Sequence, residues 1–126
     1  MQPTRSQAQP AADGAVVTKA AMRAAARLAV SNRSLARILG VSEATVSRMG
    51  AGAYQLKADD KAFELALMFV RLFRSLDSVS GGDQQTSRAW LRNDNLALGG
   101  VPVALIESLS GMINVLGYLD ARRARV

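Results

Sequence analysis

The stretch LARILGVSEATVSRM (residues 35–49) gathers small polar side chains and one arginine at helical spacing. If Val46 points inward on such a helix, Ala44 and Arg48 lie almost opposite to it. Short polar side chains beside an arginine are suited to hydrogen bonds with base edges in the major groove of DNA. The residues predicted to read bases are Ser42, Glu43, Ala44, Thr45, Ser47 and Arg48.

These side chains need two short helices joined by a sharp turn to position them. Gly40 stands where the turn requires a positive φ, and the hydroxyl of Ser42 can cap the second helix. Arg33 and Arg37 lie beside or on the preceding helix, about residues 34–39, where phosphate contacts are expected. The pattern predicts a helix-turn-helix; the alternative is an ordinary helical hairpin with a solvated outer face.

The positive charge of the chain is confined to the half that contains this motif. The net charge is +6; residues 1–58 hold eight Lys or Arg against two acids, and residues 59–126 hold eight of each sign. Lys19, Arg23 and Arg27 recur at i, i+4 on a predicted helix and add three further phosphate contacts. The asymmetry favours a polyanionic partner for the first half, against a basic face that only aids solubility.

The remaining pattern is helical throughout the chain. Residues 1–14 are predicted to be a mobile tail, and a helix is expected from Val16, with Val16, Ala20, Ala24 and Leu28 on one apolar stripe. A long helix, KAFELALMFVRLFRSL, follows Asp59-Asp60 and is apolar nearly all round, apart from a stripe at Glu64, Arg71 and Ser75. Such a helix is buried centrally or shared between subunits. The residues predicted to join two copies are Phe63, Leu67, Val70 and Phe73.

The last third of the chain predicts shorter helices around a turn-rich loop. One helix carries Trp90, which is interpreted as a core anchor in preference to an interface residue. The loop NDNLALGG follows, and Pro102 suits the first turn of a further helix that Gly111 interrupts or kinks. A final helix carries Leu119 and leads to the basic end ARRARV. Because no alternating strand pattern occurs, the fold class is predicted to be all-α.

Enzyme chemistry has little support in this sequence. The chain contains no histidine and no cysteine, so the commonest general bases, nucleophiles and zinc ligands are missing. No phosphate-binding glycine motif lies between a predicted strand and helix. We therefore expect no catalytic residue, no metal and no cofactor. No secretory signal or membrane-spanning run is found, and a cytoplasmic location is expected.

The stretch RAWLRNDNLALGGVPVALIESLSGMINVLGYLDARR resembles the toxin-binding domain of the Xre/MbcA/ParS antitoxin family. The residues that carry the resemblance are Trp90, Leu91, Asn95, Leu98, Gly99, Pro102, Leu105, Gly111, Val115, Tyr118 and Leu119, together with the helix-turn-helix. The resemblance implies an N-terminal helix-turn-helix domain (residues 15–58), a long central helix for dimerisation (59–80) and a compact helical toxin-binding domain (81–126). This chain departs from many members in ending ARRARV instead of in a short apolar tail.

The resemblance also implies a function. Such antitoxins belong to type II toxin-antitoxin systems and cover the active site of a RES-domain toxin, which consumes NAD or uses it for ADP-ribosylation. They repress their own operon on double-stranded DNA as a homodimer or larger complex. The toxin-binding residues implied here are Trp90, Asn95, Leu98, Gly99, Pro102, Tyr118, Asp120, Arg122 and Arg123. The alternatives are a stand-alone repressor whose C-terminal half dimerises or senses a ligand, and an adaptor that has lost DNA binding.

Overall fold

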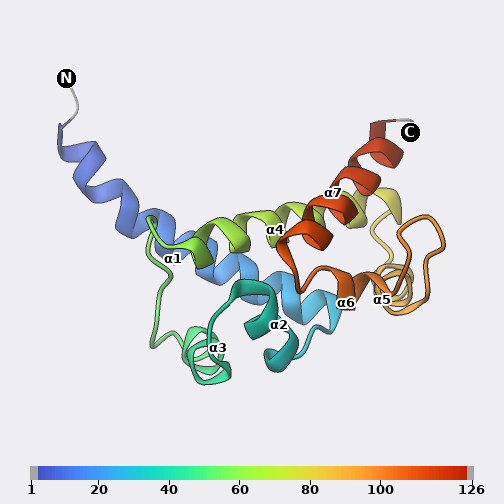
Figure 1. Cartoon of the computed structure of the whole chain (residues 1–126). Helices are drawn as coiled ribbons and strands as arrows, with labels where there is room; N and C mark the ends of the chain where they lie inside the picture. Colours follow the sequence, from blue (N-terminus) through green and yellow to red (C-terminus); the bar gives the residue numbers. More distant parts are fainter. Residues whose placement is uncertain (1–2, 125–126) are drawn as a thin grey trace.

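The computed structural model describes residues 3–124, with side chains from Asp13 onward, as seven helices and no β-strand. They are α1 (Pro3–Leu28), α2 (Asn32–Leu39), α3 (Glu43–Gly50), α4 (Lys61–Val79), α5 (Gln84–Arg92), α6 (Pro102–Leu105) and α7 (Leu109–Ala124) (Figure 1). An isolated bridge pairs Asn95 with Gly100. The predicted all-α class, with an N-terminal helix-turn-helix and a helical C-terminal part, is confirmed. No helix in the described range is long and apolar enough to cross a membrane.

The long helix α4 lies at the centre of the molecule. It packs against α1 and α2 from the first half of the chain and against α5 and α7 from the second. Phe69 and Leu72 on α4 are fully buried, as are Leu28 on α1 and Leu119 on α7. Figure 1 shows α4 between these elements, with α2 and α3 on one side and α5 to α7 toward the other end. Both halves of the chain therefore share one hydrophobic core.

Helix α1 begins earlier than predicted. Residues 3–14, expected to be a mobile tail, are helical and continuous with the rest of α1, while Met1 and Gln2 lie outside the described residues. The segment is rich in alanine and glutamine, which are good helix formers. Pro10 and Gly14 in the same segment oppose the helix, because proline has no N–H donor and glycine has a low helix propensity.

The buried stripe of α1 also differs from the predicted one. Val17, Ala21, Ala24 and Leu28 face the core, whereas Val16 is 66% exposed. Alanine fits either side of a helix, so in this alanine-rich segment apolar spacing alone does not determine which stripe is buried. The predicted stripe is right at its C-terminal end and wrong at Val16.

A buried threonine attaches α1 to the loop that leads into α4. The Thr18 hydroxyl donates to the carbonyl oxygen of Gly14 (2.6 Å) and accepts from the backbone N–H of Leu56 (2.8 Å). Gly14 permits this close approach, because a Cβ there would overlap the Leu56 carbonyl oxygen. The loop after α3 is thereby held against α1.

The C-terminal end of α1 is capped by arginines of α5. Arg88 donates from Nε to the carbonyl oxygen of Arg27 (2.8 Å) and from Nη2 to that of Ala26 (3.3 Å). Arg92 donates to the carbonyl oxygen of Ala29, which has a φ of 55°. Cations at this end interact favourably with the negative end of the helix dipole. Their N–H groups also satisfy carbonyl groups that lack helical partners.

The break near Pro102 falls before Gly111, not at it. Helix α6 ends at Leu105, and α7 begins at Leu109, capped by the Ser108 hydroxyl, which accepts from the Gly111 N–H (3.1 Å). Gly111 lies inside the first turn of α7, so the predicted interruption at this residue is wrong. Its lack of a side chain instead lets α7 approach the Leu105 carbonyl closely.

Candidate functional site

The turn between α2 and α3 forms as its local residues predict. Ser31 caps α2 by accepting from the Ser34 N–H (3.1 Å), and Gly40 ends that helix with a φ of 72°. Ser42 caps α3 by accepting from the Thr45 N–H (3.0 Å). Each cap satisfies a backbone donor that the helix itself leaves free. We call α3 the recognition helix.

The outward face of the recognition helix has the predicted composition. Val46 and Met49 are buried, 0% and 4% exposed respectively. Of the predicted base-reading residues, five are exposed and Thr45 is half-buried: Ser42, Glu43, Ala44, Thr45, Ser47 and Arg48. Ala44 and Arg48 lie opposite Val46, Thr45 and Ser47 flank them, and Ser42 and Glu43 lie at the N-terminal end of α3.

A hydroxyl pair positions the arginine of this face. The Thr45 hydroxyl lies 2.9 Å from the Ser42 hydroxyl and accepts a hydrogen bond from Arg48 Nη2 at 3.2 Å. The guanidinium therefore lies back along α3 and must swing outward to reach a base edge. The donor fork that suits guanine is present and accessible.

The two arginines expected to contact phosphates differ in their surroundings. Arg33 is exposed, whereas Arg37 forms an ion pair with Glu107, with Nη1 and Oε1 3.7 Å apart. Glu107 also accepts a hydrogen bond from the Ser34 hydroxyl at 3.2 Å. Sequence reasoning missed Glu107, because it follows α6 and no local signal connects it to α2. A phosphate at Arg37 would compete with this carboxylate.

An aromatic pair lies at the surface where α5 meets α7. The rings of Trp90 and Tyr118 are stacked, with centroids 6.2 Å apart and an angle of 23° between their planes. The Arg122 guanidinium lies 5.8 Å from the Tyr118 ring centroid, and its Nη1 donates to the Tyr118 hydroxyl at 3.3 Å. Trp90 is half-buried. Trp90 also packs against the hydrophobic core, in agreement with its interpretation as a core anchor, and the three residues form what we call the aromatic cluster.

The loop before α6 is held in shape by Asn95. Its backbone N–H donates to the Gly100 carbonyl (2.9 Å), and its side-chain oxygen accepts from the Leu98 N–H (3.1 Å). Gly99 provides the positive φ, 78°, that closes the turn. This arrangement leaves Leu96 95% exposed. Leu98 is half-buried, and Pro102 is buried at the start of α6, so Pro102 supports the loop from inside.

Two other residues assigned to toxin binding hold α7 onto α4. Asp120 forms an ion pair with Arg71 and accepts a hydrogen bond from the Ser75 hydroxyl at 3.0 Å. Arg123 donates to the same hydroxyl at 3.4 Å. Ser75, which belongs to the predicted polar stripe of α4, is fully buried. A serine in contact with a charged neighbour is buried without an unsatisfied group.

Three exposed leucine and isoleucine side chains in the C-terminal part were not singled out from the sequence. Leu96 is 95%, Leu109 58% and Ile113 51% exposed. Leu109 and Ile113 recur at i, i+4, off the buried stripe that contains Met112 and Val115. That second apolar stripe on α7 is the sequence signal that indicates Leu109 and Ile113.

The four residues predicted to join two copies have different surroundings. Phe63 is 9% exposed and belongs to the chain's own core. Leu67 is 46% exposed, and Val70 and Phe73 are half-buried. These three line an open groove between α1 and α4. A dimer through them stays a prediction, whereas Phe63 does not present its ring to a partner.

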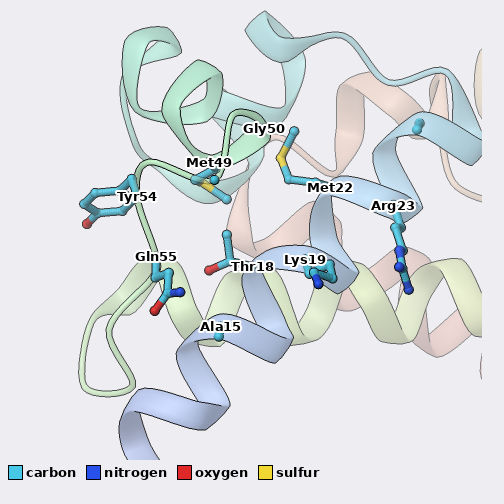
Figure 2. A pocket seen from close by; sticks show the side chains of 11 residues that line it. Ala15, Thr18, Lys19, Met22, Arg23, Met49, Gly50, Tyr54 and Gln55 are labelled. Atoms are coloured by element: carbon cyan, nitrogen blue, oxygen red, sulfur yellow. The ribbon is translucent and has the colours of Figure 1, made fainter.

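A cavity of about 400 Å³ lies between α1 and the end of α3 with the loop that follows (Figure 2). Met22 on α1 and Met49 on α3 line it together with Tyr54. Lys19 and Arg23 belong to the same lining, and Figure 2 shows the Arg23 side chain pointing away from α3. The cavity separates these two cations from the base-reading face.

Comparison with protein families assigns both halves of the chain. Residues 7–71, more than half of the chain, match the model of the antitoxin Xre-like helix-turn-helix domain. Residues 75–125 match the model of the antitoxin Xre/MbcA/ParS C-terminal toxin-binding domain. No curated protein matches the chain. The first matched region contains the recognition helix, and the second contains the aromatic cluster.

Proposed function

The chain belongs to the Xre/MbcA/ParS family of antitoxins, and from that premise we propose that it neutralises a RES-domain toxin that consumes NAD or ADP-ribosylates a target with it. The observation that carries the proposal is the order of the two matched regions, helix-turn-helix first and toxin-binding domain second, on one shared core. We further propose that the helix-turn-helix represses the operon that encodes both proteins.

Neutralisation proceeds by covering the toxin's active site. The aromatic cluster and the nearby loop support this role. Trp90 and Tyr118 are only half-buried, and Arg122 lies beside them. Trp, Tyr and Arg are the residues that most often dominate the free energy of protein–protein binding. Leu96, 95% exposed on the Asn95 loop, provides a further apolar contact.

The first experiment is co-expression of the full chain with the protein encoded beside it, purification of the complex and an assay of NAD consumption. We expect a stable complex in which NAD loss is suppressed. Trp90→Ala and Tyr118→Ala should restore NAD loss, while Arg48→Ala should leave inhibition intact. If the neighbouring protein neither binds this chain nor consumes NAD, the toxin assignment is refuted.

Operon repression is supported by the open face of the recognition helix. In a dimeric complex, two recognition helices should lie about 34 Å apart, or a multiple of it, to enter successive major grooves. Arg48→Ala should abolish specific binding while the protein stays folded, because Arg48 is the one arginine on that face. A gel-shift titration measures this, and unchanged operator affinity would contradict the proposal. Affinity should also fall steeply with salt.

A further inference from the structure

A groove runs between α1 and α4 and is used by neither surface described so far. It consists of two adjoining hollows of about 470 and 270 Å³, which share Ala20, Val70 and Arg74. Its apolar lining includes Val16, 66% exposed, and Leu67, 46% exposed. Exposed apolar side chains that line a hollow are typical of an interaction site. We call this hollow the α1–α4 groove.

The charges that line the α1–α4 groove are almost all positive. The arginines are Arg23, Arg27, Arg71, Arg74 and Arg123, and Asp77 is the one acid among the lining residues. Asp120, from α7, pairs with Arg71. The Arg71 side chain is nevertheless 63% exposed. The groove therefore combines apolar contact area with a strong positive potential.

The positive charge of the α1–α4 groove distinguishes between three possible occupants: a second copy of this chain, DNA, and a segment of another protein. A second copy of this face, packed about a two-fold axis, would bring arginines against arginines, and like charges across an interface cost several kcal/mol. DNA would satisfy the arginines but would leave Val16 and Leu67 without apolar partners. A protein segment that carries carboxylates around apolar side chains matches both features.

The lining of the groove has only Arg23 in common with the lining of the cavity next to α3. The residues Val16, Ala20 and Arg27 line the groove, whereas Ala15 and Met22 line the cavity next to α3. These two sets lie on different sides of the helix, as expected from their helical angles. A protein segment in the groove therefore does not cover the recognition helix.

We propose that the α1–α4 groove is a second docking surface for the toxin, and that it takes an acidic amphipathic helix of that protein. The inference rests on the proposed function, because it presumes a toxin partner. The aromatic cluster covers one part of the toxin, and the groove holds a second part through apolar contact and charge attraction. Leu67, Val70 and Phe73, which line this groove, are also the residues predicted to join two copies, and the test below distinguishes the two occupants.

The test measures the affinity of the full-length chain for the purified toxin by titration calorimetry at low and at high salt. Arg23→Glu combined with Arg74→Glu should weaken binding roughly tenfold or more at low salt and flatten the salt dependence. Val16→Ser combined with Leu67→Ser should weaken binding at both salt concentrations. Lys57→Glu combined with Lys61→Glu, the same change of charge outside the groove, should not weaken binding. Circular dichroism checks that each variant is folded.

Four results would overturn the inference. Unchanged toxin affinity in both groove variants, with affinity lost in Trp90→Ala, would leave the proposed function intact and refute the groove. Loss of operator binding in the arginine variant without loss of toxin affinity would assign the groove to DNA. A free-chain dimer that Val16→Ser and Leu67→Ser dissociate in sedimentation equilibrium would assign it to a second copy. If the wild-type chain does not bind the toxin at all, the proposed function itself fails, and the inference fails with it.

Discussion

Replacing Gly111 by alanine should destabilise the protein, although alanine is the better helix former. The residue lies in the first turn of α7, directly against the end of α6. A Cβ at this position would overlap the carbonyl oxygen of Leu105 and lie 2.7 Å from its carbonyl carbon. It would also lie 2.9 Å from the Ser108 hydroxyl, whereas ordinary van der Waals contact begins at 3.4 Å. The obstacle is mainly backbone, which no change of rotamer relieves.

The magnitude follows from two opposing contributions. Overpacking of this kind costs about 3 kcal/mol, the upper end of its usual range, because α6 and α7 must separate. Alanine recovers about 1 kcal/mol of helix propensity. The net loss is about 2 kcal/mol, which corresponds to a fall in Tm of about 8 °C for a chain of this size.

Gly117 provides the matched control on the same helix. It is exposed, and a Cβ there meets nothing within 4 Å. Gly117→Ala should therefore gain about 1 kcal/mol and raise the Tm by about 4 °C. Urea unfolding followed by circular dichroism and by the fluorescence of the single tryptophan measures both variants. If Gly111→Ala proved as stable as Gly117→Ala, the close approach of α6 and α7 would be refuted.

Three further perturbations test other contacts. Thr18→Val should cost about 1–3 kcal/mol in urea unfolding, because the buried N–H of Leu56 loses its acceptor; an unchanged midpoint would contradict the contact. Arg88→Ala should cost about 1–2 kcal/mol in thermal unfolding, and Arg88→Lys should restore only the charge at the end of α1. Glu107→Gln should tighten operator binding a few-fold in gel shifts by releasing Arg37, and the gain should vanish in an Arg37→Ala background.

The helix-turn-helix could be predicted from the sequence because its signals are local. Gly40 marks the positive φ, Ser42 caps the following helix, and Val46 sets which face of α3 is buried. Each of these depends on neighbours within a few residues. Backbone geometry and capping therefore indicate the turn without any knowledge of the remaining fold.

The contacts between the two halves could not be predicted in the same way. Glu107 reaches Arg37 and Ser34 across about 70 residues, and Arg88 reaches the end of α1 across about 60. A charged residue in a loop or on a short helix has the same local pattern whether it is solvated or paired. Gly111 was read as a helix breaker because sequence alone does not reveal that Leu105 packs against it.

The sequence predicts which residues belong to the candidate toxin-binding site, but not the contacts that they make. Trp90 and Tyr118 are among the residues that carry the family resemblance, but only the structure shows that their rings stack. The resemblance also implies a toxin-binding role for Asp120, yet this residue pairs with Arg71 on α4. One helix turn separates Tyr118 from Arg122, and that turn also carries Asp120 on a different side.

The shared position of α4 has a consequence for how the protein is degraded. Because α1, α2 and α7 all pack on this helix, neither half retains a complete core without the other. Cleavage within either half would expose Phe69 and Leu72 and open the remaining half to further proteolysis. No long-lived fragment should then keep one binding surface after losing the other. We therefore expect both surfaces to be lost together when the packing around α4 opens.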